Sequence, residues 1–80
     1  MAIITEVLLR RYGTQPLQEK FDYDSNNRII YYGTAPQGNL TSQSTWTINN
    51  FTYDGSGNLI NKQTAPINSI WDNRTTLTYT

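Results

Sequence analysis

Four aspartates are the side chains best suited to chemistry, because paired carboxylates can act as acid and base in glycoside cleavage. They stand at Asp22, Asp24, Asp54 and Asp72. The chain holds no histidine or cysteine and only two lysines, so the usual residues of a nucleophile with its base and of a zinc site are absent. The composition therefore argues against an enzyme and predicts no metal and no cofactor.

Asp24 and Asp54 occupy matching points of a repeated phrase, which favours a structural role for both. An aspartate that opens a hairpin loop accepts hydrogen bonds from the loop amides. A calcium loop starting at Asp54 would need glycine at its sixth position and glutamate at its twelfth, where the chain has Leu59 and Ala65. We therefore assign the two aspartates to hairpin turns.

The repeated phrase is Phe-x-Tyr-Asp, a short loop and an apolar pair, found at residues 21–30 and again at 51–60. Its alternation places both rings of a copy on one face of a strand. The third loop residue is Asn27 or Gly57, the residue types that best tolerate a left-handed backbone. Each copy is predicted to form a β-hairpin, and the wider copies span residues 21–36 and 51–66.

The composition is that of an all-β protein. Thr, Asn, Ser and Gln supply 31 of the 80 residues, and ten more are aromatic. We expect one domain over residues 1–80, an antiparallel meander of about six strands in a single small sheet or a sandwich-like or barrel-like fold. The apolar run at 3–11 is interpreted as the first strand, with a helix left open as the alternative, and residues 74–80 as the last strand.

The stretch from Trp46 to Tyr53 changes its alternation in the middle. Trp46 and Ile48 share one face, whereas Phe51 and Tyr53 share the other. A bulge at residues 49–50 would bring all four side chains to one core. The alternative is a strand that carries an aromatic residue on its wet face.

Aromatic side chains are the main material for binding, since they offer a large contact area with few rotatable bonds. A core role is the alternative for each ring, because the chain has few aliphatic residues, and a tryptophan in the last loop is expected to fold back over the core edge. Residues 34–44 and 65–73 are the loops that could carry function. The candidate interaction surface comprises Tyr12, Tyr32, Trp46 and Trp71.

Residues 23–29 and 53–59 resemble the YD repeat of Rhs-type and teneurin-like shells, which reads Tyr-Asp, two variable residues, Gly, Arg or Asn, and an aliphatic residue. Asn27 replaces the glycine in the first copy. The resemblance covers about fourteen residues, and those shells use many tandem copies. It implies hairpins and no activity.

Over most of its length the chain resembles small β-rich proteins of tailed phages, particularly marine ones. The segments that carry this resemblance are residues 3–11, 19–24, 46–53 and 71–79. The resemblance implies a virion-associated or assembly role, with no catalytic residues to map. A small carbohydrate-binding module that uses exposed Tyr and Trp is the alternative function.

The expected partners are proteins, including further copies of the chain, with a glycan as the alternative ligand. Six basic and six acidic residues balance, so neither nucleic acid nor an anionic membrane is expected as a partner. The N-terminus lacks the features of a signal peptide, and no apolar run could span a membrane. We expect synthesis in the host cytoplasm followed by association with the virion.

Overall fold

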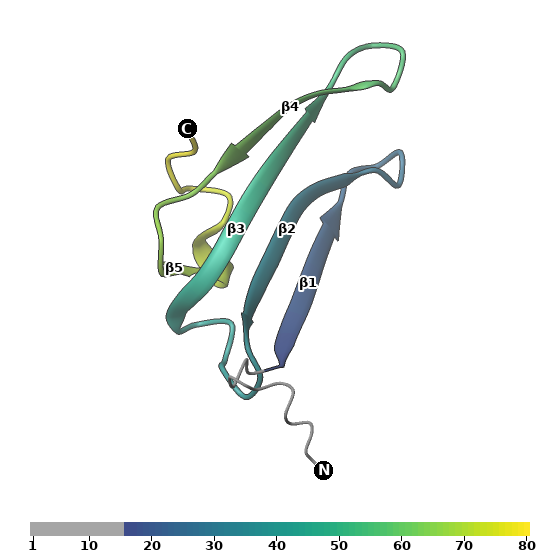
Figure 1. Cartoon of the computed structure of the whole chain (residues 1–80). Coiled ribbons are helices and arrows are strands. Elements are labelled where there is room, and N and C mark those ends of the chain that lie inside the picture. The colour runs from purple at the N-terminus through teal and green to yellow at the C-terminus, as the bar shows by residue number, and fades with distance from the viewer. Residues whose placement is uncertain (1–15) are drawn as a thin grey trace.

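A computed structural model describes residues 16–80, and this part of the chain is an antiparallel β protein (Figure 1). The sheet order is β1-β2-β3-β4, and β5 pairs with the start of β3. This confirms the predicted all-β meander, while the predicted strand at 3–11 and Tyr12 lie outside the described residues. The elements are β1 (Leu17–Tyr23), β2 (Ile29–Pro36), β3 (Ser44–Tyr53), β4 (Leu59–Thr64), β5 (Ser69–Ile70) and the 3-10 helix η1 (Trp71–Asn73).

The two copies of the repeated phrase form the hairpins β1-β2 and β3-β4. Their third loop residues, Asn27 and Gly57, have φ values of 62° and 86°, the left-handed backbone that the residue types predict. Each hairpin shifts register at the same point, beside Tyr23 in one and Tyr53 in the other. A matching bulge therefore repeats together with the sequence.

The two faces of the sheet differ in what lies over them. On the covered face, Ile48 of β3 stands opposite Gly33 of β2, with Trp46 and Ala35 further along the same strands. On the other face, Tyr32 of β2 pairs with Phe21 of β1. We call this second face the open face, because among residues 16–80 the core cluster packs only on the first.

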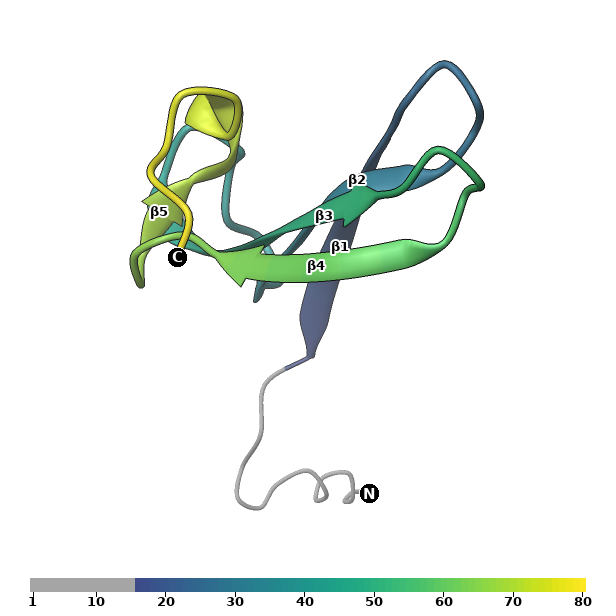
Figure 2. The same ribbon diagram turned by 90° about the horizontal axis from the view of Figure 1, so that it is seen from above.

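The chain after β4 covers the first face. Figure 2 shows β5 and η1 gathered at one end of the sheet, away from the two hairpin loops. Trp71 of η1 is 5% exposed and its ring lies 5.8 Å from the ring of Trp46, which is 0% exposed. Trp71 therefore folds back over the core, as its place in a loop predicts. The buried apolar residues are Ala35, Trp46, Ile48, Ala65 and Trp71.

Polar contacts hold this covering segment in place. Arg74 donates through Nε to the Asp22 carboxylate of β1 at 3.0 Å, and its guanidinium lies 4.7 Å from the centre of the Trp71 ring. The Tyr79 ring packs 5.8 Å from Tyr31, and its hydroxyl donates to the Arg74 carbonyl at 2.8 Å. Residues 74–79 are thus held by contacts with the sheet and by a hydrogen bond within the segment.

The predicted strand at residues 74–80 is wrong. Thr80 alone exchanges two backbone hydrogen bonds of 3.1 Å with Thr64, and the residues before it form turns. The turns begin with η1, the 3-10 helix whose first residue, Trp71, packs on the covered face. Leu77 and Tyr79 still pack against the core from this irregular backbone.

The predicted bulge at residues 49–50 is also wrong. Asn49 and Asn50 pair in unbroken register with both β2 and β4. Trp46 and Phe51 therefore remain on opposite faces of β3, which is the alternative of an aromatic residue on the wet face. Strand β3 thereby contributes side chains to the core on one face and to the open face on the other.

Gly33 lets the core close, and adding a methyl group there should destabilise it. An alanine Cβ at this position would lie 2.6 Å from Trp71 Cε3 and 3.2 Å from Trp46 Cε3. We expect Gly33→Ala to lower the free energy of unfolding by about 1–3 kcal/mol through overpacking. Urea unfolding followed by tryptophan fluorescence measures this loss.

Gly55→Ala is the matched control, because no atom lies within 4 Å of the place its methyl group would take and its φ is not positive. Its free energy of unfolding should stay within about 0.5 kcal/mol of the wild type. Equal stability of the two variants would show that the Trp71 ring does not rest on Gly33.

Candidate interaction surface

The open face carries a patch of aromatic and aliphatic side chains near the hairpin loops. Its outermost members are strongly exposed, with Phe21 at 45%, Tyr23 at 53% and Leu59 at 55%. Contiguous exposed apolar side chains on the surface of a small domain mark a contact surface. The patch comprises Phe21, Tyr23, Ile29, Tyr32, Phe51, Tyr53 and Leu59.

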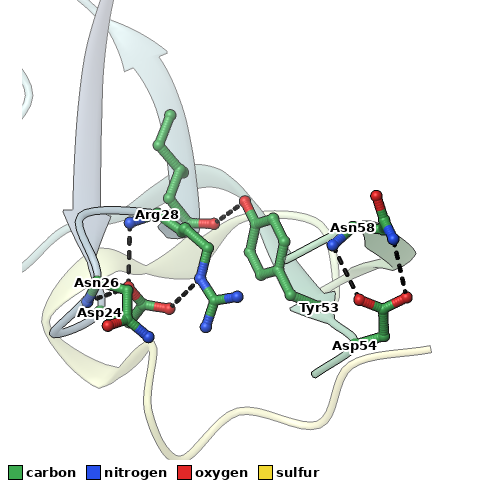
Figure 3. Close-up of polar contacts among 7 residues, drawn as sticks. Asp24, Asn26, Arg28, Tyr53, Asp54 and Asn58 are labelled. Atoms are coloured by element: carbon green, nitrogen blue, oxygen red, sulfur yellow. Dashed lines mark hydrogen bonds and ion pairs between the residues drawn. The ribbon is translucent and has the colours of Figure 1, made fainter. Parts of the chain in front are cut away.

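The centre of the patch is hollowed between the two hairpins. Five of its side chains line a shallow hollow of about 270 Å³, and they come from β2, β3 and β4. The Tyr53 hydroxyl donates to the Ile29 carbonyl at 2.7 Å, and the Arg28 guanidinium lies 4.8 Å from the centre of the Tyr53 ring (Figure 3). These contacts fix the second hairpin against the first and keep the hollow in shape.

The turn aspartates use their carboxylates inside the loops. Asp24 Oδ1 accepts from the backbone N–H of Asn26 at 2.8 Å and of Arg28 at 3.0 Å, while Oδ2 accepts from Arg28 Nε at 2.9 Å (Figure 3). Asp54 does the same with the backbone N–H groups of Ser56 and Asn58, both at 2.9 Å. Both carboxylates therefore act in turns, and both oxygens of each accept hydrogen bonds from their own loop.

These hydrogen bonds favour the charged form of each aspartate. The Arg28 backbone N–H lowers the pKa of Asp24 below its ordinary value of 3.8, and the Asn58 backbone N–H lowers the pKa of Asp54 in the same way. A carboxylate with a lowered pKa is a poor general acid at neutral pH. The electrostatics therefore oppose the paired-carboxylate chemistry considered from the sequence.

Tyr32 lies on the open face and is half-buried. Its ring packs 5.1 Å from Phe21, and its hydroxyl donates to the Glu19 carboxylate, which raises the pKa of Tyr32. Tyr79, on the covered face, has its pKa raised to about 12, mainly by burial. Both hydroxyls are protonated donors at neutral pH, and Tyr32 is the one that belongs to the predicted surface.

Trp46 and Trp71 were named as candidates for the interaction surface with a core role as the other possibility, and the structure places both in the core. Their rings pack against each other at a tilt of 39°, and the Trp46 indole N–H donates to the Leu40 carbonyl at 3.1 Å. A large ring with one polar atom suits a core as well as it suits a surface. Because the chain has only two tryptophans, the glycan-binding alternative loses the rings on which it mainly relied.

Six of the seven residues of the patch were not predicted from the sequence, which named only Tyr32. The six were interpreted as hairpin scaffold, yet they lie on the open face: Phe21, Tyr23, Ile29, Phe51, Tyr53 and Leu59. The signal was present in the strict alternation of the repeated phrase, which puts its rings on one face. The alternation does not show which face of the sheet the rest of the chain covers.

No group of three or more Asp or Glu side chains that could hold a metal ion occurs within residues 16–80. No helix in this part of the chain is long and apolar enough to cross a membrane. Comparison of the chain with protein families, curated proteins and solved structures found no match. The surface itself is therefore the basis for a functional proposal.

The turn carboxylates predict how stability depends on pH. Their pKa values are lower in the folded chain than in the unfolded chain, so they stabilise the fold above about pH 4, and this stabilisation is lost as the pH falls through the folded values. Replacing both (Asp24→Asn with Asp54→Asn) should lower the melting temperature at pH 7 and flatten its fall at acid pH. Calorimetry from about pH 7 to about pH 2.5 tests this.

Asp72→Asn is the control, because Asp72 is exposed and lies outside the hairpin loops. It removes one negative charge and should leave the acid dependence of the melting temperature as in the wild type. A double Asp24/Asp54 variant with an unchanged pH profile would refute the stabilising role of the turn carboxylates.

Proposed function

We propose that this protein is a non-enzymatic structural protein that acts by associating with other proteins, as a component of a tailed-phage virion. The open face is the observation that carries the proposal. It gathers seven aromatic and aliphatic side chains on one side of the sheet, and no element of residues 16–80 packs over them. Covering such a patch with a partner removes apolar area from water.

The small core supports an associating role. Five apolar residues are buried within residues 16–80, and two of them are alanines. A chain of this length buries only roughly 60% of its unfolded surface, and this one has no disulfide to add stability. A partner on the open face would supply stability that the chain does not generate alone.

The acidic groups also support a non-enzymatic role. Asp22 pairs with Arg74, Asp24 pairs with Arg28, and Asp54 bonds within its own loop. Their carboxylates serve the fold, and the hollow of the open face is lined by apolar side chains and tyrosines. Such a lining suits contact with a protein surface better than it suits acid-base chemistry.

The virion assignment rests on the resemblance of residues 3–11, 19–24, 46–53 and 71–79 to small β-rich proteins of tailed phages. Two of these segments lie in the hairpins and one forms most of the covering segment, so the resemblance extends over the parts that build both faces. A virion component is held in the particle by contacts with neighbouring proteins, and the open face offers apolar surface for such a contact.

Incorporation into particles tests the proposal. We expect the chain to be detected by mass spectrometry in purified particles of the phage that encodes it. Phe51→Ser, at the centre of the open face, should reduce its amount per particle at least about fivefold, because a buried aromatic contact of about 1 kcal/mol or more is lost. The unfolding curve of the variant checks that its fold is retained.

Ile67→Ser is the matched control, since Ile67 is 84% exposed and lies outside the open face. It should enter particles like the wild type. Particles that lack the chain would refute the virion assignment, and equal incorporation of the two variants would refute the role of the open face.

A further inference from the structure

The thirty-residue repeat relates each edge strand of the sheet to one of the two strands that meet at its centre. A shift of thirty residues carries β1 onto β3, since Phe21 and Tyr23 become Phe51 and Tyr53. The same shift carries β2 onto β4. The central pair β2-β3 joins the first hairpin to the second, while β1 and β4 form the two edges of the sheet that residues 16–80 build (Figure 1).

We propose that copies of this chain join edge to edge, with β4 of one copy pairing antiparallel with β1 of the next, in the register that β2 and β3 use inside the chain. This inference rests on the proposed associating function and names a second copy as one of the partners. The joint would repeat a contact that the chain already makes once, so each new copy adds two further hairpins to the same sheet.

The register follows from the central pair. Inside the chain Tyr32 pairs with Asn49, and Tyr31 pairs with Asn50. The thirty-residue shift converts the first of these pairs into Lys62 opposite Glu19 of the next copy. It converts the second pair into Asn61 opposite Lys20 of the next copy.

Charge complementarity supports this register. A lysine directly opposite a glutamate on neighbouring strands forms a favourable cross-strand pair. Within residues 16–80 the ion pairs are Arg28 with Asp24 and Arg74 with Asp22, so Lys62 has no acidic partner there. The Glu19 carboxylate accepts a hydrogen bond from the Tyr32 hydroxyl of its own copy. The joint would thus bring together two opposite charges that stand on opposite edges.

The backbone groups of the two edges point the right way. Thr64 exchanges both of its backbone hydrogen bonds with Thr80, on the side away from β3, so by alternation Lys62 also presents its N–H and C=O outward. The Pro16 carbonyl accepts from the Gln37 N–H on the β2 side, so Glu19 presents its own groups outward. Lys62 and Glu19 can therefore exchange two hydrogen bonds.

Tyrosine exposure points to the same joint. At the centre of the sheet the Tyr53 hydroxyl donates to the Ile29 carbonyl of the neighbouring hairpin. The repeat equivalents of these two residues are Tyr23 and Leu59, which are 53% and 55% exposed. Edge pairing would place Tyr23 of the next copy beside Leu59, and give its hydroxyl the same acceptor.

Thr80 limits the extent of the joint. It occupies the place opposite Thr64 that Leu17 of the next copy would take. The pairing is therefore centred on Lys62 and runs toward Ile60, which is 61% exposed and would lie near Phe21 of the next copy. The C-terminal residue keeps its own contact with β4.

Charge exchange tests the joint. Sedimentation velocity at low salt should show concentration-dependent association of the wild type. Lys62→Glu and Glu19→Lys each place like charges opposite one another, so each variant alone should associate about tenfold more weakly. In an equimolar mixture every joint between unlike variants regains opposite charges, and association should return to the wild-type level.

Each result of the mixing experiment supports or overturns the edge joint. Recovery in the mixture shows that both variants are folded and that these two side chains meet. A monomeric wild type at millimolar concentration, single variants that associate like the wild type, or no recovery in the mixture would overturn the edge joint. Reduced incorporation of Phe51→Ser would still stand in that case, so the proposed function can survive the loss of this inference.

Cysteine cross-linking checks the register. Asn61 and Lys20 are exposed, and the chain has no cysteine of its own. The Asn61→Cys, Lys20→Cys variant should give a ladder of disulfide-linked copies, because opposite residues of a non-hydrogen-bonded pair lie at about 4.5 Å between Cα atoms. Within one chain the two edges are three strand spacings apart, or about 14 Å, which excludes an internal bond.

The matched control is Lys20→Cys with Asn73→Cys, in which the second cysteine replaces an exposed asparagine of η1. It should give no ladder under the same oxidation. Equal ladders from both variants would overturn the proposed register.

Discussion

The contact of the Trp71 ring with Gly33 and Trp46 is the interaction on which the rest of this structure depends. A sheet one layer thick must cover at least one face, and here a segment of sixteen residues after β4 does so. Gly33 provides the space, Trp71 provides the area, and Arg74 closes the segment onto β1 through Asp22. Because that segment covers only one face, the side chains of the open face remain available for contact with a partner.

The hairpins could be predicted from the sequence because their information is local. Asp24, Asn27, Asp54 and Gly57 satisfy loop geometry within a few residues of themselves, and alternation is visible without knowing the partner strand. The path of residues 71–80 could not be predicted, since it depends on a glycine about forty positions earlier. The sequence left open whether Trp46 and Trp71 lie in the core or on the surface for a related reason, because residue type alone does not distinguish a core ring from a surface ring.

The repeat shows how position in the sheet, rather than side-chain chemistry, decides environment. Tyr53 and Tyr23 occupy the same place in the phrase, but a second hairpin lies beside one of them and not beside the other. Ile29 and Leu59 differ in exposure for the same reason. Several residues of the candidate surface therefore have a neighbouring strand on one side only. One copy of the phrase does not show which residues these are.

The ion pair between Asp22 and Arg74 spans 52 residues, and this separation has a consequence for the order of folding. Hairpin contacts close short loops and form early, whereas contacts of long separation form late. Both hairpins can therefore form before Trp71 and Arg74 dock onto the sheet. Until they dock, the sheet exposes both of its faces, and the contacts of residues 71–74 decide which face is withdrawn from water.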